Sequence, residues 1–318
     1  MATVIAECCQ NHNGDLGILK EMVWAAADAG ADWVKIQSIS ANELTRRDRF
    51  EHGVIEGGEQ KTIKRPYQPE YERLRPMDLD DDAHVWLIEE CERAGVKSMT
   101  TVFSRAQIPF LASLPWKAIK VASYDCASFP MLRELIAHFE HLYISTGATH
   151  TREIEQAAEL LAGHSYTFLH CVTVYPTPLD SLHLARMDFL RRFTPSVGFS
   201  DHSHVPRDGI KASLAALWLG ADTVERHFTV LPPDQTRDGP VSINPEQLAE
   251  LVRYAQMPRE ELGSQVREQI GDHRAMLGLA DRPLSAAEEL NRDYYRGRFA
   301  SRVGDGFVFN WEESPVHV

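Results

Sequence analysis

Hydrophobic and polar positions along the chain switch repeatedly between two periods, and this pattern predicts eight βα units. Short runs rich in β-branched and aromatic residues recur at 3–9, 33–38, 97–103, 118–125, 141–148, 166–175, 196–203 and 222–230. Amphipathic stretches with apolar residues at helical spacing follow these runs, as at 14–31 and 80–95. Eight such units in about 255 residues are the expected content of a parallel (β/α)8 TIM barrel.

An open, doubly wound sheet is the competing fold, but no G-x-G-x-x-G sequence follows the first run to support it. We therefore predict a catalytic barrel domain over residues 1–257. Residues 258–318 form a tail packed on that barrel, with helices at 259–277 and 284–295 and a short extended end. The connection 41–79 is long and contains several prolines, and loops of this length are typically lids or binding loops.

Composition narrows the class of protein. The chain has no run of 18 apolar residues, so no membrane span is expected. Its N-terminus lacks the basic region of a signal peptide. The formal net charge of −13 argues against a nucleic-acid or anionic-membrane partner. The five cysteines include no C-x-x-C pair, which favours reduced thiols in a cytoplasmic protein.

Polar residues gather where the predicted strands end, and in a barrel of this kind the chemistry lies at the C-terminal ends of the strands. Lys35 and Lys120 lie within strands, where an ammonium group needs an anion. Hydroxyl and backbone donors at the neighbouring strand ends complete what resembles a cradle for phosphate and carboxylate groups. Lysines that extend from a sheet edge into solvent are the alternative interpretation.

His202 and His227 fall on adjacent predicted strands, and imidazole is the commonest protein ligand of divalent transition metals. Glu7 could serve as a third ligand or bind a metal-held water. The alternative at this point is that both histidines are core residues whose hydrogen bonds are made within the protein. In the run that contains His227, strand alternation places Glu225 on the same face as His227. Arg226 then points outward, toward the helices or an acidic partner.

Several stretches together resemble the sialic acid synthase (NeuB) family, whose members condense phosphoenolpyruvate with a sugar aldehyde. The most specific are NHNGD at 11–15, HC-x-x-x-YPTP at 170–178, SDH at 200–202 and ERHFT at 225–229. Matching stretches extend over 4–230, nearly the whole predicted barrel, and the family fold is a (β/α)8 barrel. The resemblance therefore implies a cytoplasmic synthase, a transferase of carbohydrate biosynthesis.

The resemblance also implies roles for individual residues. It gives His202 and His227 as ligands of a manganese or magnesium ion that polarises the acceptor aldehyde, with Glu7 beside the metal water. The positions matching phosphoenolpyruvate contacts are Lys35, Thr101, Lys120, Ser123, Ser145 and Ser200. Those on the acceptor side are Gln37, Asp125, Thr173 and Tyr175. The catalytic set is then Glu7, Lys35, Lys120, His202 and His227, and the products are a 2-keto acid and phosphate.

Departures from the family pattern cluster on the acceptor side. The usual S-G-E is Ser123-Tyr124-Asp125 here, and the usual asparagine of the sixth-strand motif is Thr173. The usual G-P-D is Gly239-Pro240-Val241, with Asp238 as a candidate replacement. The family's C-terminal antifreeze-like domain would begin near Val318, so we expect a barrel without it.

These departures predict an aldose-like acceptor other than N-acetylmannosamine. The connection 41–79 or the arginine-rich tail (Arg292, Arg296, Arg298, Arg302) would then close the site. The expected partners are small molecules, and a homodimer is compatible with the sequence. Two other functions stay open: a metal-dependent aldolase or isomerase that does not use phosphoenolpyruvate, and a non-catalytic sugar-binding barrel.

Overall fold

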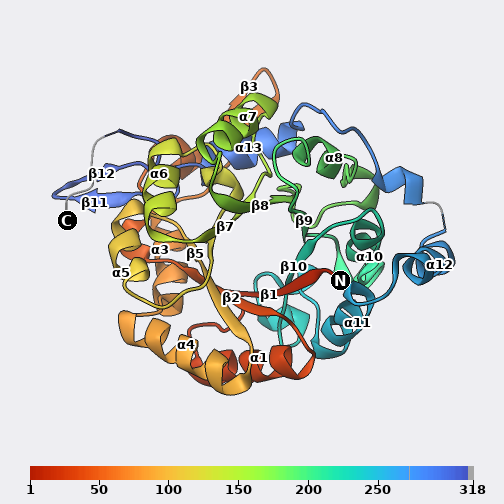
Figure 1. The fold of residues 1–318 in the computed structure, drawn as a ribbon. Helices are drawn as coiled ribbons and strands as arrows, with labels where there is room; N and C mark the ends of the chain where they lie inside the picture. Colours follow the sequence, from red (N-terminus) through yellow and green to blue (C-terminus); the bar gives the residue numbers. More distant parts are fainter. Residues whose placement is uncertain (272, 314–318) are drawn as a thin grey trace.

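Eight parallel strands close into a barrel in the computed structural model, which describes residues 1–271 and 273–313 (Figure 1). The strands follow one another around the barrel in the order β1-β10-β9-β8-β7-β6-β5-β2, and β1 pairs with both β10 and β2. The predicted (β/α)8 barrel is confirmed. The barrel strands are β1 (Thr3–Cys9), β2 (Trp33–Ser38), β5 (Lys97–Val102), β6 (Ile119–Val121), β7 (His141–Ser145), β8 (Ser165–His170), β9 (Val197–Asp201) and β10 (Thr223–His227).

Helices surround the barrel on its outside (Figure 1). The helices of the barrel units are α1 (Leu16–Asp28), α4 (Asp81–Ala94), α5 (Ile108–Ala112), α6 (Phe129–His138), α7 (Thr151–Leu160), α8 (Arg186–Leu190), α9 (Val205–Asp208), α10 (Lys211–Trp218) and α11 (Pro245–Ala255). Local sequence fixes their ends. Asp15 caps α1 by accepting hydrogen bonds from the backbone of Gly17 and Ile18, and α4 ends at Gly95 with φ +75°. The described residues contain no helix long and apolar enough to cross a membrane.

Several strands end before their hydrophobic runs do, and the difference is largest for two of them. The run 118–125 forms strand only over Ile119–Val121, because the chain then turns out of the barrel in a 3-10 helix at Ser123–Asp125. The run 166–175 forms strand only as far as His170. In both places the polar end of the run therefore belongs to the loop above the barrel.

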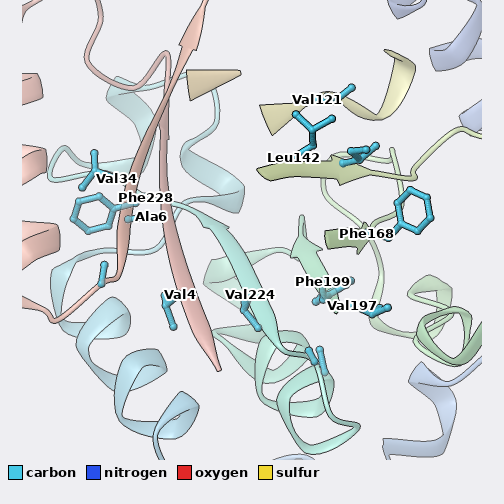
Figure 2. Close-up of a cluster of buried hydrophobic side chains, with 14 of the residues drawn as sticks. Val4, Ala6, Val34, Val121, Leu142, Phe168, Val197, Phe199, Val224 and Phe228 are labelled. Carbon is cyan, nitrogen blue, oxygen red and sulfur yellow. The ribbon is translucent and has the colours of Figure 1, made fainter. Parts of the chain in front are cut away.

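Strand alternation sorts the side chains into two sets. Outward side chains such as Val4, Val224 and Phe199 pack under the helices in the main hydrophobic cluster (Figure 2). Inward side chains form a separate apolar layer across the barrel, made of Ile5, Trp33, Met99, Ala118, Tyr143 and Leu169. Gly198 lies where a Cβ atom would come within 2.3 Å of the Thr223 carbonyl oxygen, so only glycine fits there. The barrel is thus filled below the level of the polar strand ends.

Two further segments lie over the barrel. The connection 41–79 contains α2 (Arg49–His52), α3 (Tyr67–Leu74) and a hairpin of β3 (Val54–Glu56) and β4 (Glu59–Thr62). The tail contains α12 (Arg259–Gln269), α13 (Ala286–Tyr295) and a hairpin of β11 (Ser301–Val303) and β12 (Gly306–Val308). The helix predicted over 259–277 ends at Gln269, and 273–276 form a short 3-10 turn. Residue 272 and the last five of the predicted tail, 314–318, lie outside the described residues.

The connection and the tail contact each other directly. The backbone of Thr45 donates to the Arg298 carbonyl at 2.9 Å, and the Arg47 guanidinium donates to the Tyr294 carbonyl at 2.6 Å. The ring of Tyr294 also packs edge-on against Phe50, with centroids 5.1 Å apart. These contacts make one rim out of two segments that are distant in the sequence.

Candidate active site

A cavity of about 410 Å³ opens at the C-terminal ends of the barrel strands. Its walls include every predicted site residue except Thr173: Glu7, Lys35, Gln37, Thr101, Lys120, Ser123, Asp125, Ser145, Tyr175, Ser200, His202 and His227. Alternation explains this convergence. Glu7, Lys35 and Thr101 each follow a member of the inward apolar layer by two positions, so they face inward one level higher. The sequence pattern therefore brings these side chains to one level of the barrel.

Lys35 is held among acids and a hydroxyl at the cavity floor. Its Nζ donates to Thr101 Oγ1 at 2.9 Å, contacts the Glu7 carboxylate and lies 3.6 Å from Glu225 Oε2. Burial lowers the pKa of Lys35 to about 7, an effect that the nearby Glu225 carboxylate opposes and that Lys120 reinforces. Lys35 is therefore a buried cation whose charge can change near neutral pH.

Lys120 lies on the other side of Glu225. Its Nζ donates to Ser145 Oγ at 2.7 Å and to the Val121 carbonyl at 3.0 Å, and it lies 4.0 Å from Glu225 Oε1. Ser200 donates to the same carboxylate oxygen at 2.8 Å. Burial disfavours the charge on Glu225, but the two lysines outweigh burial and lower its pKa to about 2. The floor thus places Glu225 between two lysines, one of which also contacts Glu7.

Glu225 is a cavity residue that our sequence analysis left out of the site. Its signal was present, because alternation placed it on the face of His227. Arg226 points the other way, as expected, and its fully buried guanidinium pairs with Asp201 and donates to Ser203 Oγ at 3.0 Å. The charges of ERHFT are therefore divided between the cavity and the packing outside the barrel.

His202 and His227 lie together at the edge of the cavity, with ring centroids 5.3 Å apart. His202 Nδ1 lies 3.2 Å from the Val172 carbonyl, and burial, reinforced by His227, lowers the pKa of His202 to about 3. Burial also lowers the pKa of His227. His227 Nδ1 is buried without a hydrogen-bond partner. Two neutral imidazoles, one with an unsatisfied ring nitrogen, fit the needs of a divalent cation.

The residues expected on the acceptor side already make hydrogen bonds within the protein. The Asp125 carboxylate accepts hydrogen bonds from Ser128 Oγ and Asn310 Nδ2, each at 2.9 Å, and burial raises its pKa to about 6. Thr173 is buried but does not line the cavity, and its carbonyl accepts a hydrogen bond from Asn291 Nδ2 at 2.7 Å. Asn291 and Asn310 belong to the tail, which therefore holds this side of the site in place.

Further residues line the cavity beside the predicted set. Tyr124, Asp238 and Arg298 were singled out in the sequence as acceptor-side departures or rim candidates. No pattern in the sequence selected the others, which are Cys9, Gln10, Arg65, Arg73, Phe103, Ala122, Arg237, Tyr295, Gly297 and Phe299. Tyr124 and Tyr295 stack with centroids 5.0 Å apart. Of the four arginines expected to close the site, Arg298 lines the cavity. Arg298 also pairs with Glu70, and Arg292 and Arg296 both pair with Glu153.

The cavity has a charge balance opposite to that of the chain. Six basic and four acidic side chains line it, whereas the chain as a whole carries a formal net charge of −13. A concave, cationic site in an acidic protein attracts small anions and leaves the outer surface repulsive to polyanions.

Comparison with known proteins gives a consistent result. The model of the NeuB family matches residues 22–267. N,N'-diacetyllegionaminic acid synthase of Legionella pneumophila is 31% identical over 311 residues, which cover 94% of this chain and 83% of that protein. The synthase of the same name from Campylobacter jejuni is 29% identical over 306 residues, covering 91% and 86%.

Solved structures show the same fold. Spore coat polysaccharide biosynthesis protein SpsE of Bacillus subtilis aligns with a TM-score of 0.71 and 26% identity, over 92% of this chain and 77% of that one. N-acetylneuraminic acid synthetase of Leptospira borgpetersenii, in complex with citrate, aligns with a TM-score of 0.68 and 26% identity, over 92% and 90%.

Proposed function

The chain belongs to the NeuB family, and we propose that it is a synthase that condenses phosphoenolpyruvate with an aldose-like aldehyde. The products would be a 2-keto acid and inorganic phosphate. The observation that carries the proposal is the pair of buried lysines, Lys35 and Lys120, which face one cavity together with the hydroxyl groups of Thr101 and Ser145.

Phosphoenolpyruvate carries a carboxylate and a phosphate on one small carbon frame, so it needs two groups of cationic donors close together. Lys35 and Lys120 both lie within 4.0 Å of the Glu225 carboxylate, on its two sides. Ordered cations beside hydroxyl donors bind such anions by charge-assisted hydrogen bonds. A cavity of about 410 Å³ is within the usual range for small-molecule sites, about 300–1,000 Å³.

The reaction would form a bond between C3 of phosphoenolpyruvate and the aldehyde carbon, water would add at C2, and the C2–O bond to phosphate would break. The lysines would neutralise the anionic substrate where charge develops. Glu7, held by the Cys9 backbone N–H at 2.6 Å, would accept a proton from the attacking water. A manganese or other divalent ion at His202 and His227 would act as a Lewis acid toward the aldehyde oxygen.

The acceptor is expected to differ from N-acetylmannosamine. Tyr124 stacks on Tyr295 in the cavity wall, and Asp125 already accepts hydrogen bonds from Ser128 and the tail residue Asn310. A site with a different set of donors and acceptors discriminates strongly against ligands that leave its polar groups unpaired. We therefore propose another aldose-like aldehyde, used in the synthesis of a surface or specialised carbohydrate.

The test is phosphate release from phosphoenolpyruvate across a panel of aldoses, with manganese present. The proposal expects release that requires both substrates and a stoichiometric 2-keto acid product. N-acetylmannosamine should be among the poorer acceptors. Cleavage or isomerisation of sugars without phosphoenolpyruvate would instead establish the aldolase or isomerase alternative. Sugar binding without turnover of any acceptor would establish the non-catalytic barrel.

A further inference from the structure

Three groups of different chemistry converge beside the two histidines. Cys9 Sγ, His227 and Asp238 each offer a donor atom, and these atoms all lie within 4.8 Å of one another. Cys9 Sγ lies 2.8 Å from Asp238 Oδ2, and His227 Nδ1 lies 3.7 Å from the same oxygen. Two donors on one transition-metal ion are separated by at most about 4.6 Å, since metal–ligand distances are about 2.0–2.3 Å. Shifts of a few tenths of an ångström would bring the three around one ion.

We propose that Cys9 and Asp238 join His227 in a single mixed thiolate–imidazole–carboxylate site for a first-row transition-metal ion, at the cavity edge beside His202. This goes beyond the two-histidine site that the family resemblance implies. It rests on the proposed function only for what the ion would do in catalysis.

Elements at the cavity edge hold these ligands independently of any ion. Cys9 ends β1 and His227 ends the neighbouring strand β10. Asp238 lies in the loop after β10, where its carbonyl accepts a hydrogen bond from Ser242 Oγ at 2.7 Å. Asn11 Nδ2 in turn donates to Ser242 Oγ at 2.9 Å. The Asp238 backbone is thereby tied to the loop that follows Cys9.

Two observations point to a ligand in addition to the cluster itself. His227 is 7% exposed, and its Nδ1 is buried with no hydrogen-bond partner. His202 has the arrangement common among metal-binding histidines, with one ring nitrogen directed at a backbone carbonyl, here that of Val172. That contact occupies Nδ1 of His202 and leaves Nε2 for a further partner.

The donor set also selects among ions. Thiolate and imidazole groups suit zinc, iron and cobalt, whereas magnesium takes oxygen ligands almost exclusively. A site that uses Cys9 should therefore discriminate against Mg²⁺. The adjacent cysteine supplies a contrast, because Cys8 points outward into the hydrophobic cluster and does not line the cavity.

The experiment is a Co²⁺ titration of the full-length, chelator-treated protein without substrates, followed by near-ultraviolet absorption and metal analysis. We expect one equivalent of Co²⁺ and an intense thiolate-to-cobalt absorption band that excess Mg²⁺ does not remove. Cys9→Ser should abolish the band, and Cys8→Ala, the matched control, should keep it. Asp238→Asn should keep the band but weaken Co²⁺ binding by at least about tenfold, the loss seen when even an outer partner is removed.

Unchanged Co²⁺ affinity and spectrum in Cys9→Ser would overturn the inference, as would loss of the band in Cys8→Ala. Circular dichroism checks the fold, and if Cys9→Ser does not fold, Cys9→Ala and Asp238→Asn decide by the same criteria. The outcome is separable from the proposed function. Phosphate release without a thiolate-to-cobalt band would refute only the metal site proposed here. A thiolate-to-cobalt band without condensation of any aldehyde would refute only the proposed function.

Discussion

Replacing Lys120 by methionine tests the anion cradle directly. Methionine keeps much of the length of the buried side chain and removes its charge. It also removes hydrogen bonds from Nζ to Ser145 Oγ and the Val121 carbonyl. Glu225 would keep two partners, the Lys35 Nζ at 3.6 Å and the Ser200 hydroxyl at 2.8 Å, so its carboxylate would not be left without contacts. The protein should therefore fold, and the loss should fall on substrate binding.

The size of the effect follows from the kind of contact that is lost. A hydrogen bond to a charged group contributes about 1.5–3 kcal/mol, which corresponds to roughly a 10- to 150-fold change in an equilibrium constant. Removing Lys120 also leaves Glu225 less screened, so the carboxylate would repel an incoming anion. Both effects act in the same direction. We expect kcat/KM for phosphoenolpyruvate to fall toward the upper end of that range.

Steady-state phosphate release at varied phosphoenolpyruvate and saturating aldehyde measures this effect, with the melting temperature as a check on folding. Lys117→Met is the matched control, because Lys117 is exposed at the other end of the same βα unit and does not line the cavity. An unchanged KM and kcat for phosphoenolpyruvate in a folded Lys120→Met protein would refute the cradle.

Three further predictions concern pH, stability and the rim. Because burial lowers the pKa of Lys35 to about 7, and a lysine loses its charge above its pKa, kcat/KM for phosphoenolpyruvate should decline as pH rises through about 7. Lys35→Arg should move that decline to higher pH, and a flat profile over about pH 6–9 would contradict the assignment. Asp201→Ala should lower the free energy of unfolding by about 3–5 kcal/mol in urea denaturation, because it leaves the Arg226 charge buried and unpaired; a loss below about 1 kcal/mol would show otherwise. Arg298→Ala should raise the acceptor KM by roughly tenfold and change that of phosphoenolpyruvate less, while exposed Arg302→Ala changes neither; equal effects on both substrates would argue against a rim role.

Strand periodicity was enough to predict the barrel and most of the cavity floor. Five polar residues lie two positions beyond a member of the inward apolar layer, and they are Glu7, Lys35, Thr101, Lys120 and Ser145. Glu225 could also have been included. Alternation places it on the face of His227, and two buried lysines need a nearby negative charge. Thr173 shows where the period stops being informative. Its hydrophobic run continues to residue 175, but β8 ends at His170, so alternation no longer sets side-chain direction.

The rim could not be predicted by such reasoning. Arg298 reaches the cavity because its backbone pairs with Thr45, and Arg47 binds the carbonyl of Tyr294. Contacts of this kind depend on where two irregular segments meet after the barrel has formed. No local period in either segment encodes them. The cluster of Cys9, His227 and Asp238 likewise depends on a loop conformation that residue spacing does not specify.

The interlocked rim has a consequence for the order in which the protein matures on the ribosome. The barrel can close once β10 has emerged, because β10 pairs with β1. The hydrogen bond from Thr45 to Arg298 must wait for about 70 more residues, which takes several seconds at typical translation rates of about 5–20 residues per second. A nascent chain at that stage would hold the lysines and histidines of the floor but lack the wall of Tyr295, Gly297 and Phe299. Binding of the acceptor should therefore be the last property that the protein acquires during its synthesis.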